Sequence, residues 1–559
     1  METWGYLHRW RYGVLQSVGF GFVAGAFEAV NIAASSRLAL SWFQALVLGL
    51  LAVAVMGGIG GVFGAVAGGP IQALHRAPQS VSATLSRHLA GAVFLLTGFY
   101  LWQMAFRLLA DGASPGAWGA LAAMPLGFAG VAFFNARFWL RKMELGRPSS
   151  LGWLPISAMA STVVVGGAAA SWALRDPGGA FALEGDPNVV IITVDGLRFD
   201  DVEAVGGDGL GRSPAIDGLA PGGTVFANAV APTGTSRSAL ATIHTGLHPL
   251  RHKLLHPTDF LSRGYRTVAE GLQDEGWATA AFVSSSPAAA GSGLEQGFRV
   301  YDDDFVPGVA GMGRLLLVQD ALALASWLGL PSPWRSADTT ARRAAAWVEA
   351  HGEKPFALWV HLADPMHRDD DLDATNRVDD AVQVVRDAVA EAGVGERTTW
   401  VVLGTHGELR GAHGGQGSAT LFDEVVRVPL VLHWHDSEAD VGRVSAQVRT
   451  MDVATTVAVA MGLDPLEETE GVELWGYATG KRKATISTSL VGQDLDGRWV
   501  LGLRNNGVKV LRDDAGSEVL YDLSSDPGET TDLSTEQAKV LLSAQQILAP
   551  DQIALDRLR

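Results

Sequence analysis

The hydropathy of this 559-residue chain divides it into two parts, and that division most constrains what it can fold into. A helix needs about 20 apolar residues to cross the hydrocarbon core of a membrane. Five such stretches occur, all before residue 175, at roughly 12–34, 40–68, 87–109, 115–138 and 151–174. We therefore expect an N-terminal domain of about five transmembrane helices over residues 1–175.

The distribution of charge predicts how these spans are oriented. Residues 1–175 carry 11 Lys and Arg against 4 Asp and Glu, whereas the remainder carries 31 against 55. The basic residues gather before the first span and after the second and fourth, and loops rich in Lys and Arg stay in the cytoplasm. This predicts an integral membrane protein with a cytoplasmic N-terminus and a large extracytoplasmic C-terminal domain, periplasmic or extracellular. Glu28, inside the first span, is either a substrate or headgroup contact or an interfacial carboxylate facing water.

A linker at 176–187 precedes a region in which strand and helix patterns alternate. Buried-strand runs lie at 188–194, 356–360 and 399–403, and helical stretches at 338–351 and 376–392. This alternation indicates an α/β fold, a mixed sheet sandwiched by helices, which we place at 188–465.

A small C-terminal subdomain is expected at 466–559. Antiparallel strands are predicted at 498–503 and 507–511, with a closing helix near 534–548. The chain has no cysteine, which excludes disulfides and cysteine-based metal sites or nucleophiles. Its acidic C-terminal part predicts that nucleic acid is not a partner, because phosphate backbones are bound by clustered Lys and Arg. The acidic runs Asp302-Asp303-Asp304 and Asp369-Asp370-Asp371 lack calcium-loop spacing and are interpreted as solvated faces.

Polar side chains follow two of the predicted strands. Asp195 comes directly after the first strand, and His406 closely follows a later one. Because ligands on α/β sheets collect at the carboxyl ends of the strands, these two side chains are expected at one edge. A hydroxyl cluster with a fixed cation could join them at Thr233, Thr235, Ser236 and Arg237. Together they could hold a metal ion and an ester of phosphate or sulfate. The alternative is that Asp195 caps a helix and that His406 is a hydrogen-bonded loop histidine.

Several motifs resemble the sulfatases of the alkaline phosphatase superfamily, in family order from about 188 to 533. The matching segments include Val194-Asp195-Gly196-Leu197-Arg198-Phe199-Asp200, Thr233-Gly234-Thr235-Ser236-Arg237, Thr405-His406-Gly407-Glu408, Asp423-Glu424 with Arg427-Val428-Pro429-Leu430, and Leu520-Tyr521-Asp522-Leu523. The chain is thus similar to a membrane-anchored sulfatase-like hydrolase or transferase with degenerate metal motifs.

This resemblance implies one divalent ion, Zn²⁺, Mn²⁺, Ca²⁺ or Mg²⁺, held by Asp195, Thr233 and His406. Further metal-binding Asp residues that are common in the family are replaced here by Gly196 and Thr405. The catalytic residues that the resemblance implies are Thr233, Arg237, His252 and His367. By its setting in a Leu- and Pro-rich stretch, however, His252 is interpreted, together with His248, as a structural histidine.

Threonine at position 233 cannot become the formylglycine of sulfatases, so no formylglycine is expected. A threonine nucleophile instead resembles lipoteichoic acid synthase and phosphoethanolamine transferases, which also join five spans to an outer domain. The expected function is therefore hydrolysis or transfer of sulfate or phosphate esters, including lipid or cell-envelope headgroups, at the extracytoplasmic membrane face. The alternatives are a sulfatase-fold pseudoenzyme that serves as a binding or scaffold module and, with little support from the spans, a transporter.

Overall fold

The computed structural model describes residues 185–206, 213–256, 259–305, 334–367, 371–435, 442–505 and 507–558. The five expected spans, Glu28, Asp369 and Asp370 lie outside these residues. Among the described residues, no helix is both long and apolar enough to cross a membrane. All described residues belong to one compact unit of the chain.

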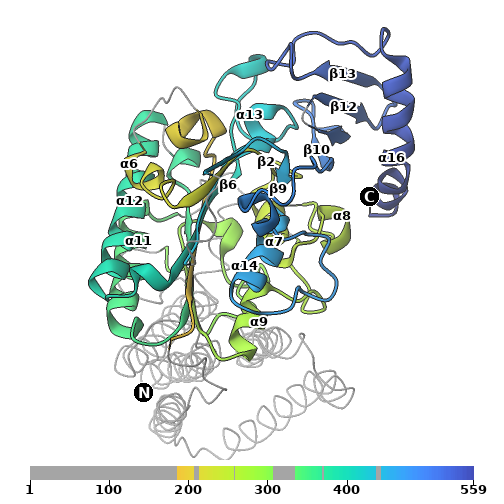
Figure 1. Cartoon of the computed structure of the whole chain (residues 1–559). Helices are drawn as coiled ribbons and strands as arrows, with labels where there is room; N and C mark the ends of the chain where they lie inside the picture. Colours follow the sequence, from red (N-terminus) through yellow and green to blue (C-terminus); the bar gives the residue numbers. More distant parts are fainter. Residues whose placement is uncertain are drawn as a thin grey trace, which may run out of the picture. The chain divides into compact units, whose positions relative to one another are not determined.

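A mixed sheet runs through the centre of this unit (Figure 1). Its strands are β1 (Asn188–Asp195), β2 (Gly223–Val230), β3 (Ala278–Val283), β4 (Val300–Asp302), β5 (Phe356–Leu362), β6 (Thr398–His406), β7 (Arg427–His433), β8 (Gly442–Val444) and β9 (Val448–Arg449). They follow the order β4-β3-β5-β1-β6-β7-β2-β8, and β9 also pairs with β2. Only β7 runs antiparallel to its neighbours β6 and β2.

The strand β1 lies between β5 and β6 and is parallel to both. All eight of its residues are buried, and its apolar side chains alternate between the two faces. A strand covered by helices on both sides needs such an uninterrupted apolar run. The strands predicted at 188–194, 356–360 and 399–403 are β1, β5 and β6. In the register of β1 with β6, Asp195 stands opposite His406, so these two residues do share one edge.

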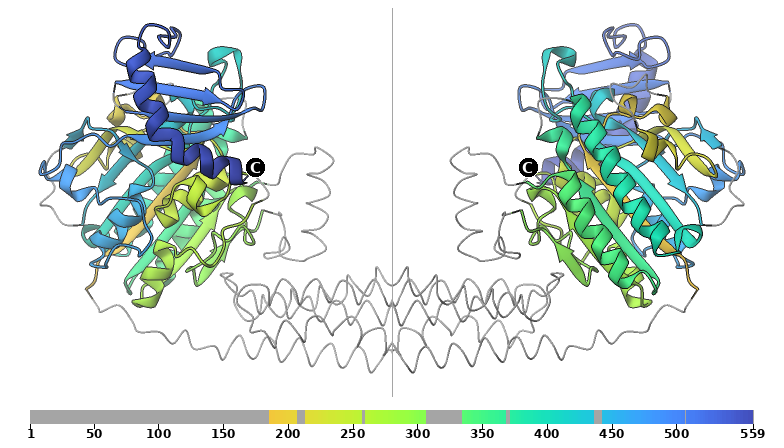
Figure 2. Two further views of the ribbon diagram at one scale, coloured as in Figure 1. Left: turned by 90° about the vertical axis from the view of Figure 1, so that its right-hand side faces the viewer. Right: turned by 90° about the vertical axis from the view of Figure 1, so that its left-hand side faces the viewer.

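Helices cover both faces of the sheet (Figures 1 and 2). They are α6 (Pro214–Asp217), α7 (Ser236–Thr245), α8 (Pro249–His252), α9 (Val268–Asp274), α11 (Ala337–His351), α12 (Asp371–Glu391), α13 (Asp423–Val426), α14 (Asp452–Ala460) and α15 (Trp475–Ala478). The apolar residues of α6, α11 and α12 pack on one face, and those of α7, α9 and α14 on the other. The predicted helices at 338–351 and 376–392 correspond to α11 and α12. Ser336 starts α11 by accepting a hydrogen bond from the Thr339 N–H.

A four-stranded antiparallel sheet follows along the chain (Figure 2). Its strands are β10 (Thr488–Gln493), β11 (Trp499–Arg504), β12 (Val508–Asp513) and β13 (Glu518–Asp522), and α16 (Ala538–Leu558) packs on it. The helix expected near 534–548 therefore begins later and continues past Pro550. It continues because its apolar face does: Leu548 and Leu555 are both buried. The domain limits at 175, 187 and 465 stay predictions.

A buried ion cluster joins this small sheet to the large one. The Lys509 ammonium, fully buried on β12, lies 2.6 Å from Asp423 of α13 and 2.8 Å from Glu529. Arg504 of β11 donates to the same Asp423 carboxylate. Lys509 also donates to the Leu421 carbonyl at 2.9 Å. Buried charges are stable only when they are paired in this way.

The acidic run at 302–304 differs from its interpretation as a solvated face. All three side chains are buried. Asp302 is ion-paired with Arg335 at 2.7 Å and with Arg343 at 3.0 Å. The sequence alone suggested a solvated run because Arg335 and Arg343, which pair with it, lie much further along the chain.

Candidate functional site

The carboxyl ends of the three central strands bring three ionisable side chains together. Asp195 is the last residue of β1, His406 the last of β6, and His361 lies near the end of β5. Asp195 Oδ2 is 3.5 Å from His361 Nε2, and Asp195 Oδ1 is 3.8 Å from His406 Nε2. Thr405 donates its hydroxyl hydrogen to Asp195. These four residues are named here the Asp195 cluster.

The Asp195 carboxylate is held in its charged form. Burial alone would raise its pKa, but His361, His406 and the hydrogen bond from Thr405 outweigh that effect and lower the pKa below its usual range. Asp195 caps no helix, because the helical turn that follows starts after Arg198. The expected meeting of Asp195 with His406 is therefore found, whereas the capping alternative is not.

His361 is a member of this cluster that the sequence did not single out. Its ring is fully buried; Nδ1 is 3.0 Å from the Thr193 hydroxyl and Nε2 is 3.1 Å from the Ser285 hydroxyl. A histidine inside an apolar strand resembles a core residue. The one signal available was its place at the end of a strand adjacent to that of Asp195.

The His406 ring connects the cluster to α7. Its Nδ1 is 2.8 Å from the Gly407 carbonyl, and its Nε2 is 2.9 Å from the Ser236 hydroxyl. A carbonyl can only accept a hydrogen bond, so Nδ1 carries the hydrogen. Nε2 is hydrogen-bonded to Ser236, at the first position of α7, and lies 3.8 Å from an Asp195 oxygen.

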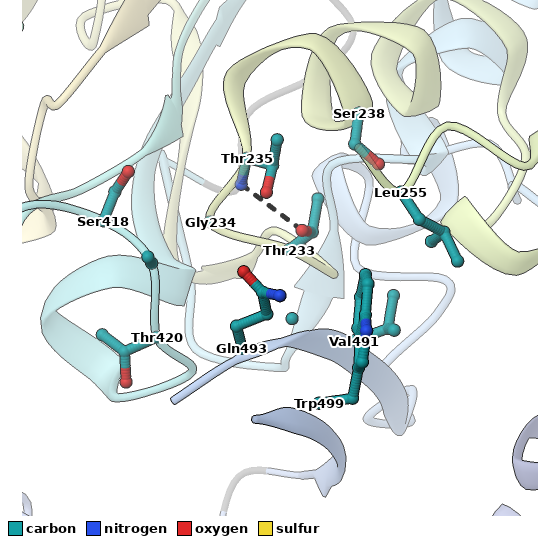
Figure 3. Close-up of a pocket in the computed structure, with 12 residues that line it drawn as sticks. Thr233, Gly234, Thr235, Ser238, Leu255, Ser418, Thr420, Val491, Gln493 and Trp499 are labelled. Atoms are coloured by element: carbon teal, nitrogen blue, oxygen red, sulfur yellow. Dashed lines mark hydrogen bonds between the residues drawn. The ribbon is translucent and has the colours of Figure 1, made fainter. Parts of the chain in front are cut away.

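Thr233 lies in the loop between β2 and α7. It lines a small cavity that is separate from the Asp195 cluster (Figure 3). The structure records no contact of Thr233 with Asp195 or His406 among the described residues; its hydroxyl accepts from the Thr235 N–H at 3.3 Å. The cavity measures about 30 Å³, room for roughly two waters. Its lining residues are Thr233, Gly234, Thr235, Ser238, Leu255, Ser418, Ala419, Thr420, Val491, Gly492, Gln493 and Trp499.

Five of the twelve residues that line this cavity carry a hydroxyl, and none of the twelve is charged. Ser238 is buried, and its hydroxyl has no hydrogen-bond partner in the described part of the chain. The first turn of the ten-residue α7 forms one wall. Gln493 and Trp499 approach from the small sheet on the opposite side (Figure 3). Nothing in the local sequence marked those two residues, since they lie far along the chain from Thr233.

Arg237 is not among the residues that line this cavity. Its guanidinium donates to the carbonyls of Pro287 at 3.0 Å, Asp259 at 2.9 Å and Ser286 at 3.5 Å. These bonds hold two loops beside α7. The structure thus gives Arg237 a backbone-bracing role, whereas the resemblance implied contact with a tetrahedral oxyanion.

The other two histidines that the resemblance implied differ from each other. His252 is buried; Nε2 is 3.0 Å from the Thr242 hydroxyl, and Nδ1 accepts from the Leu254 N–H. Both nitrogens are engaged, which fits the structural interpretation. His367 stacks on Trp334 with ring centroids 4.9 Å apart. Burial lowers its pKa, while the charge of nearby Asp195 opposes that shift, so His367 belongs to the surroundings of the cluster.

The residues present do not fit the divalent ion that the resemblance implies. Asp195 is the one carboxylate of the cluster, and no group of three or more His, Cys, Asp or Glu residues suited to a metal occurs in the described ranges. Ca²⁺ takes about six to eight oxygen ligands, and catalytic Zn²⁺ about three protein ligands. Although Asp195, His361 and His406 are neighbours, both nitrogens of each imidazole already have partners within the protein.

Comparison with known proteins identifies the fold. The family model described as Sulfatase matches residues 187–365 and 340–463. The phosphonate monoester hydrolase of Agrobacterium radiobacter has a TM-score of 0.53 at 18% identity, covering 66% of this chain and 96% of that one. A 2-O GAG sulfatase has a TM-score of 0.52 at 16% identity, covering 66% and 93%.

A further solved structure was determined in complex with its substrate, D-glucosamine-2-N,6-O-disulfate. Its TM-score is 0.54 at 15% identity, covering 66% of this chain and 98% of that one. Identities this low show a common fold and nothing finer. No curated protein matches the chain by sequence.

Proposed function

This chain belongs to the sulfatase family of the alkaline phosphatase superfamily, and on that premise we propose that it recognises a sulfate or phosphate ester in the cavity at Thr233. The observation that carries the proposal is the lining of that cavity. Hydroxyls of Thr233 and Ser238 lie against the N-terminus of α7, and Ser238 has no partner of its own. Backbone N–H groups at a helix N-terminus bind tetrahedral oxyanions.

Turnover by Thr233 is the enzymatic form of this proposal. The threonine oxygen attacks phosphorus or sulfur, the bond to the ester oxygen breaks, and the alcohol leaves with the proton of the hydroxyl. The oxygen of water or of a second alcohol then attacks the same atom, the bond to the Thr233 oxygen breaks, and that oxygen regains its hydrogen from the attacking group, which gives hydrolysis or transfer. Members of the sulfatase family use a metal ion for such chemistry, but no step here is assigned to one, because the donors of the Asp195 cluster do not fit it.

The proposed substrate is held at the membrane. The five apolar stretches in residues 1–175 and their flanking charges support an extracytoplasmic position for the described unit. A lipid or cell-envelope headgroup is therefore the first substrate class to test. Sulfated sugars are the second, because one structural neighbour was solved with a disulfated glucosamine.

Recognition without turnover is the second candidate function. Two observations favour it: the cavity has no charged lining residue, and the Asp195 cluster offers a single carboxylate. A protein with these features can still bind an oxyanion through neutral donors. It would lack the charge stabilisation that speeds ester cleavage.

The two forms are separated by measuring binding and cleavage on the same detergent-purified full chain. Inorganic sulfate and phosphate are titrated calorimetrically, and chromogenic sulfate monoesters, phosphate monoesters and phosphodiesters are assayed for release. The variants are Thr233→Ala and, as a matched control, Thr339→Ala at an exposed threonine of α11. Cleavage lost only in Thr233→Ala identifies an enzyme, and binding without cleavage identifies a binding module. Absence of both in the unmodified chain contradicts the proposal.

A further inference from the structure

The Asp195 cluster lies at the position where the resemblance implies a metal ion, yet its side chains satisfy one another. We infer that this cluster is a hydrogen-bonded substitute for a metal centre, in which Thr405, His361 and His406 stabilise Asp195 and no divalent cation is taken up. The inference does not require that the Thr233 cavity bind an ester, so the two proposals can fail separately.

The first argument is the hydroxyl of Thr405. A carboxylate at this position would add negative charge and further lone pairs, which hard cations need. Threonine instead supplies a hydrogen-bond donor, and its hydroxyl donates to Oδ1 of Asp195. That oxygen is then paired without a cation. Thr405 is fully buried, and its hydroxyl also lies 3.3 Å from the Val194 carbonyl, so its acceptors all come from the protein itself.

The second argument is the use of the two imidazoles. A metal ion binds the lone pair of a ring nitrogen. In His406 Nδ1 donates to the Gly407 carbonyl, and Nε2 is hydrogen-bonded to the Ser236 hydroxyl. In His361 both nitrogens lie within 3.1 Å of hydroxyls, those of Thr193 and Ser285. Binding a cation would require breaking these buried hydrogen bonds first.

The third argument concerns Gly196, where many family members carry a second Asp. A Cβ atom at this position would lie 3.1 Å from the sulfur of Met366 and 3.2 Å from Cβ of Pro365. Gly196 also has φ of +77°, a conformation that side chains rarely adopt. An apolar thioether and a proline ring thus border the space of the missing carboxylate. The sequence therefore lacks a carboxylate at position 196, and the packing around Gly196 leaves little space for one.

Metal uptake by the unmodified chain is the direct test. The detergent-purified full chain is treated with chelator, and Ca²⁺, Mg²⁺, Mn²⁺ and Zn²⁺ are then added separately. We expect substoichiometric metal by elemental analysis and an unchanged melting temperature. About one ion per chain that is lost in Asp195→Asn would overturn the inference. An ion that persists in Asp195→Asn is bound elsewhere and leaves this cluster metal-free, as inferred.

A reconstruction at position 405 tests the mechanism of the loss. Thr405→Asp places a second carboxylate beside Asp195, so this variant should melt below the unmodified chain in chelator. It should gain about one ion per chain, and with it thermal stability. The matched control Thr405→Asn has the same shape without the charge and should gain neither. A folded Thr405→Asp protein that takes up no metal overturns the role given to Thr405; if that variant does not fold, the unmodified chain decides alone.

Discussion

The Ser236 hydroxyl lies 2.9 Å from Nε2 of His406, so the first turn of α7 is hydrogen-bonded to the last residue of β6. This bond crosses from the helix that lines the Thr233 cavity to the Asp195 cluster. The two sites have no lining residue in common, but they share this connection. A change at His406 is therefore expected to shift α7, and with it one wall of the cavity.

Replacing Ser236 by Ala should weaken the fold modestly. The variant leaves Nε2 of the fully buried His406 without its hydrogen-bond partner, which costs about 1 kcal/mol in the free energy of unfolding. The bond from His406 to the Gly407 carbonyl remains and limits the loss. Denaturant titration of the full chain in detergent measures the change. Ser543→Ala in the exposed part of α16 is the control, and equal stability of both variants would contradict this account.

Lys509→Met should destabilise the protein much more. It leaves Asp423 and Glu529 as buried carboxylates without their ammonium partner, which costs about 3–5 kcal/mol. It also frees the Leu421 carbonyl in the segment that leads from the cavity wall at Thr420. Arg498→Met removes an exposed cation of the same sheet and should leave the denaturation midpoint unchanged. A small effect of Lys509→Met would show that the ion cluster does not hold the two sheets together.

Gly234→Ala should distort the cavity wall. A Cβ atom at this position would collide with the backbone carbonyl of Ser418 and lie 2.7 Å from Val425. Backbone cannot move aside cheaply, so overpacking of about 1–3 kcal/mol is expected, together with loss of any oxyanion binding at Thr233. Gly395→Ala, with open space around its added methyl, is the control. If calorimetric binding is unchanged in a destabilised Gly234→Ala chain, the oxyanion does not bind in the Thr233 cavity.

The sequence predicted the framework of the large sheet because buried parallel strands leave a direct signal. The apolar runs of β1, β5 and β6 needed no tertiary information to be recognised. Their order along the chain, with Asp195 and His406 after strands, also predicted the shared edge. Amphipathic patterns were less exact at helix ends, as the displaced start of α16 shows.

Side-chain partners could not be predicted in the same way. Arg237 matched a motif in type and spacing, but its direction depends on loops that supply three carbonyls. His361 was hidden in an apolar run, and its role depends on register with β1. Gln493 meets the Thr233 cavity because β10 lies beside the loop after β2, where the Val491 N–H donates to the Pro232 carbonyl at 2.9 Å. These contacts arise from tertiary packing, which local sequence patterns do not encode.

The buried imidazole of His244 should make the protein sensitive to acid. Neither ring nitrogen has a hydrogen-bond partner among the described residues, and the ring packs edge-on against Trp359 with centroids 4.2 Å apart. Burial, with a smaller contribution from His361, lowers the pKa of His244 from 6.5 to about 3. The unfolded chain therefore binds this proton more readily than the folded one. The contribution of neutral His244 to the free energy of unfolding is fully present above pH 6.5. It is lost as the pH falls from there toward 3.

His244→Leu should flatten that dependence. Each such histidine contributes a slope of up to about 1.4 kcal/mol per pH unit within the window, and His252, whose pKa burial also lowers to about 3, keeps its own share. Leucine has a similar volume and no polar atom to bury, so the variant should be at least as stable at pH 7. Denaturation midpoints between pH 7 and pH 4 measure the slope, with the exposed His256→Leu as control. Parallel profiles for His244→Leu and the unmodified chain would mean that His244 is protonated, or solvated, in the folded state.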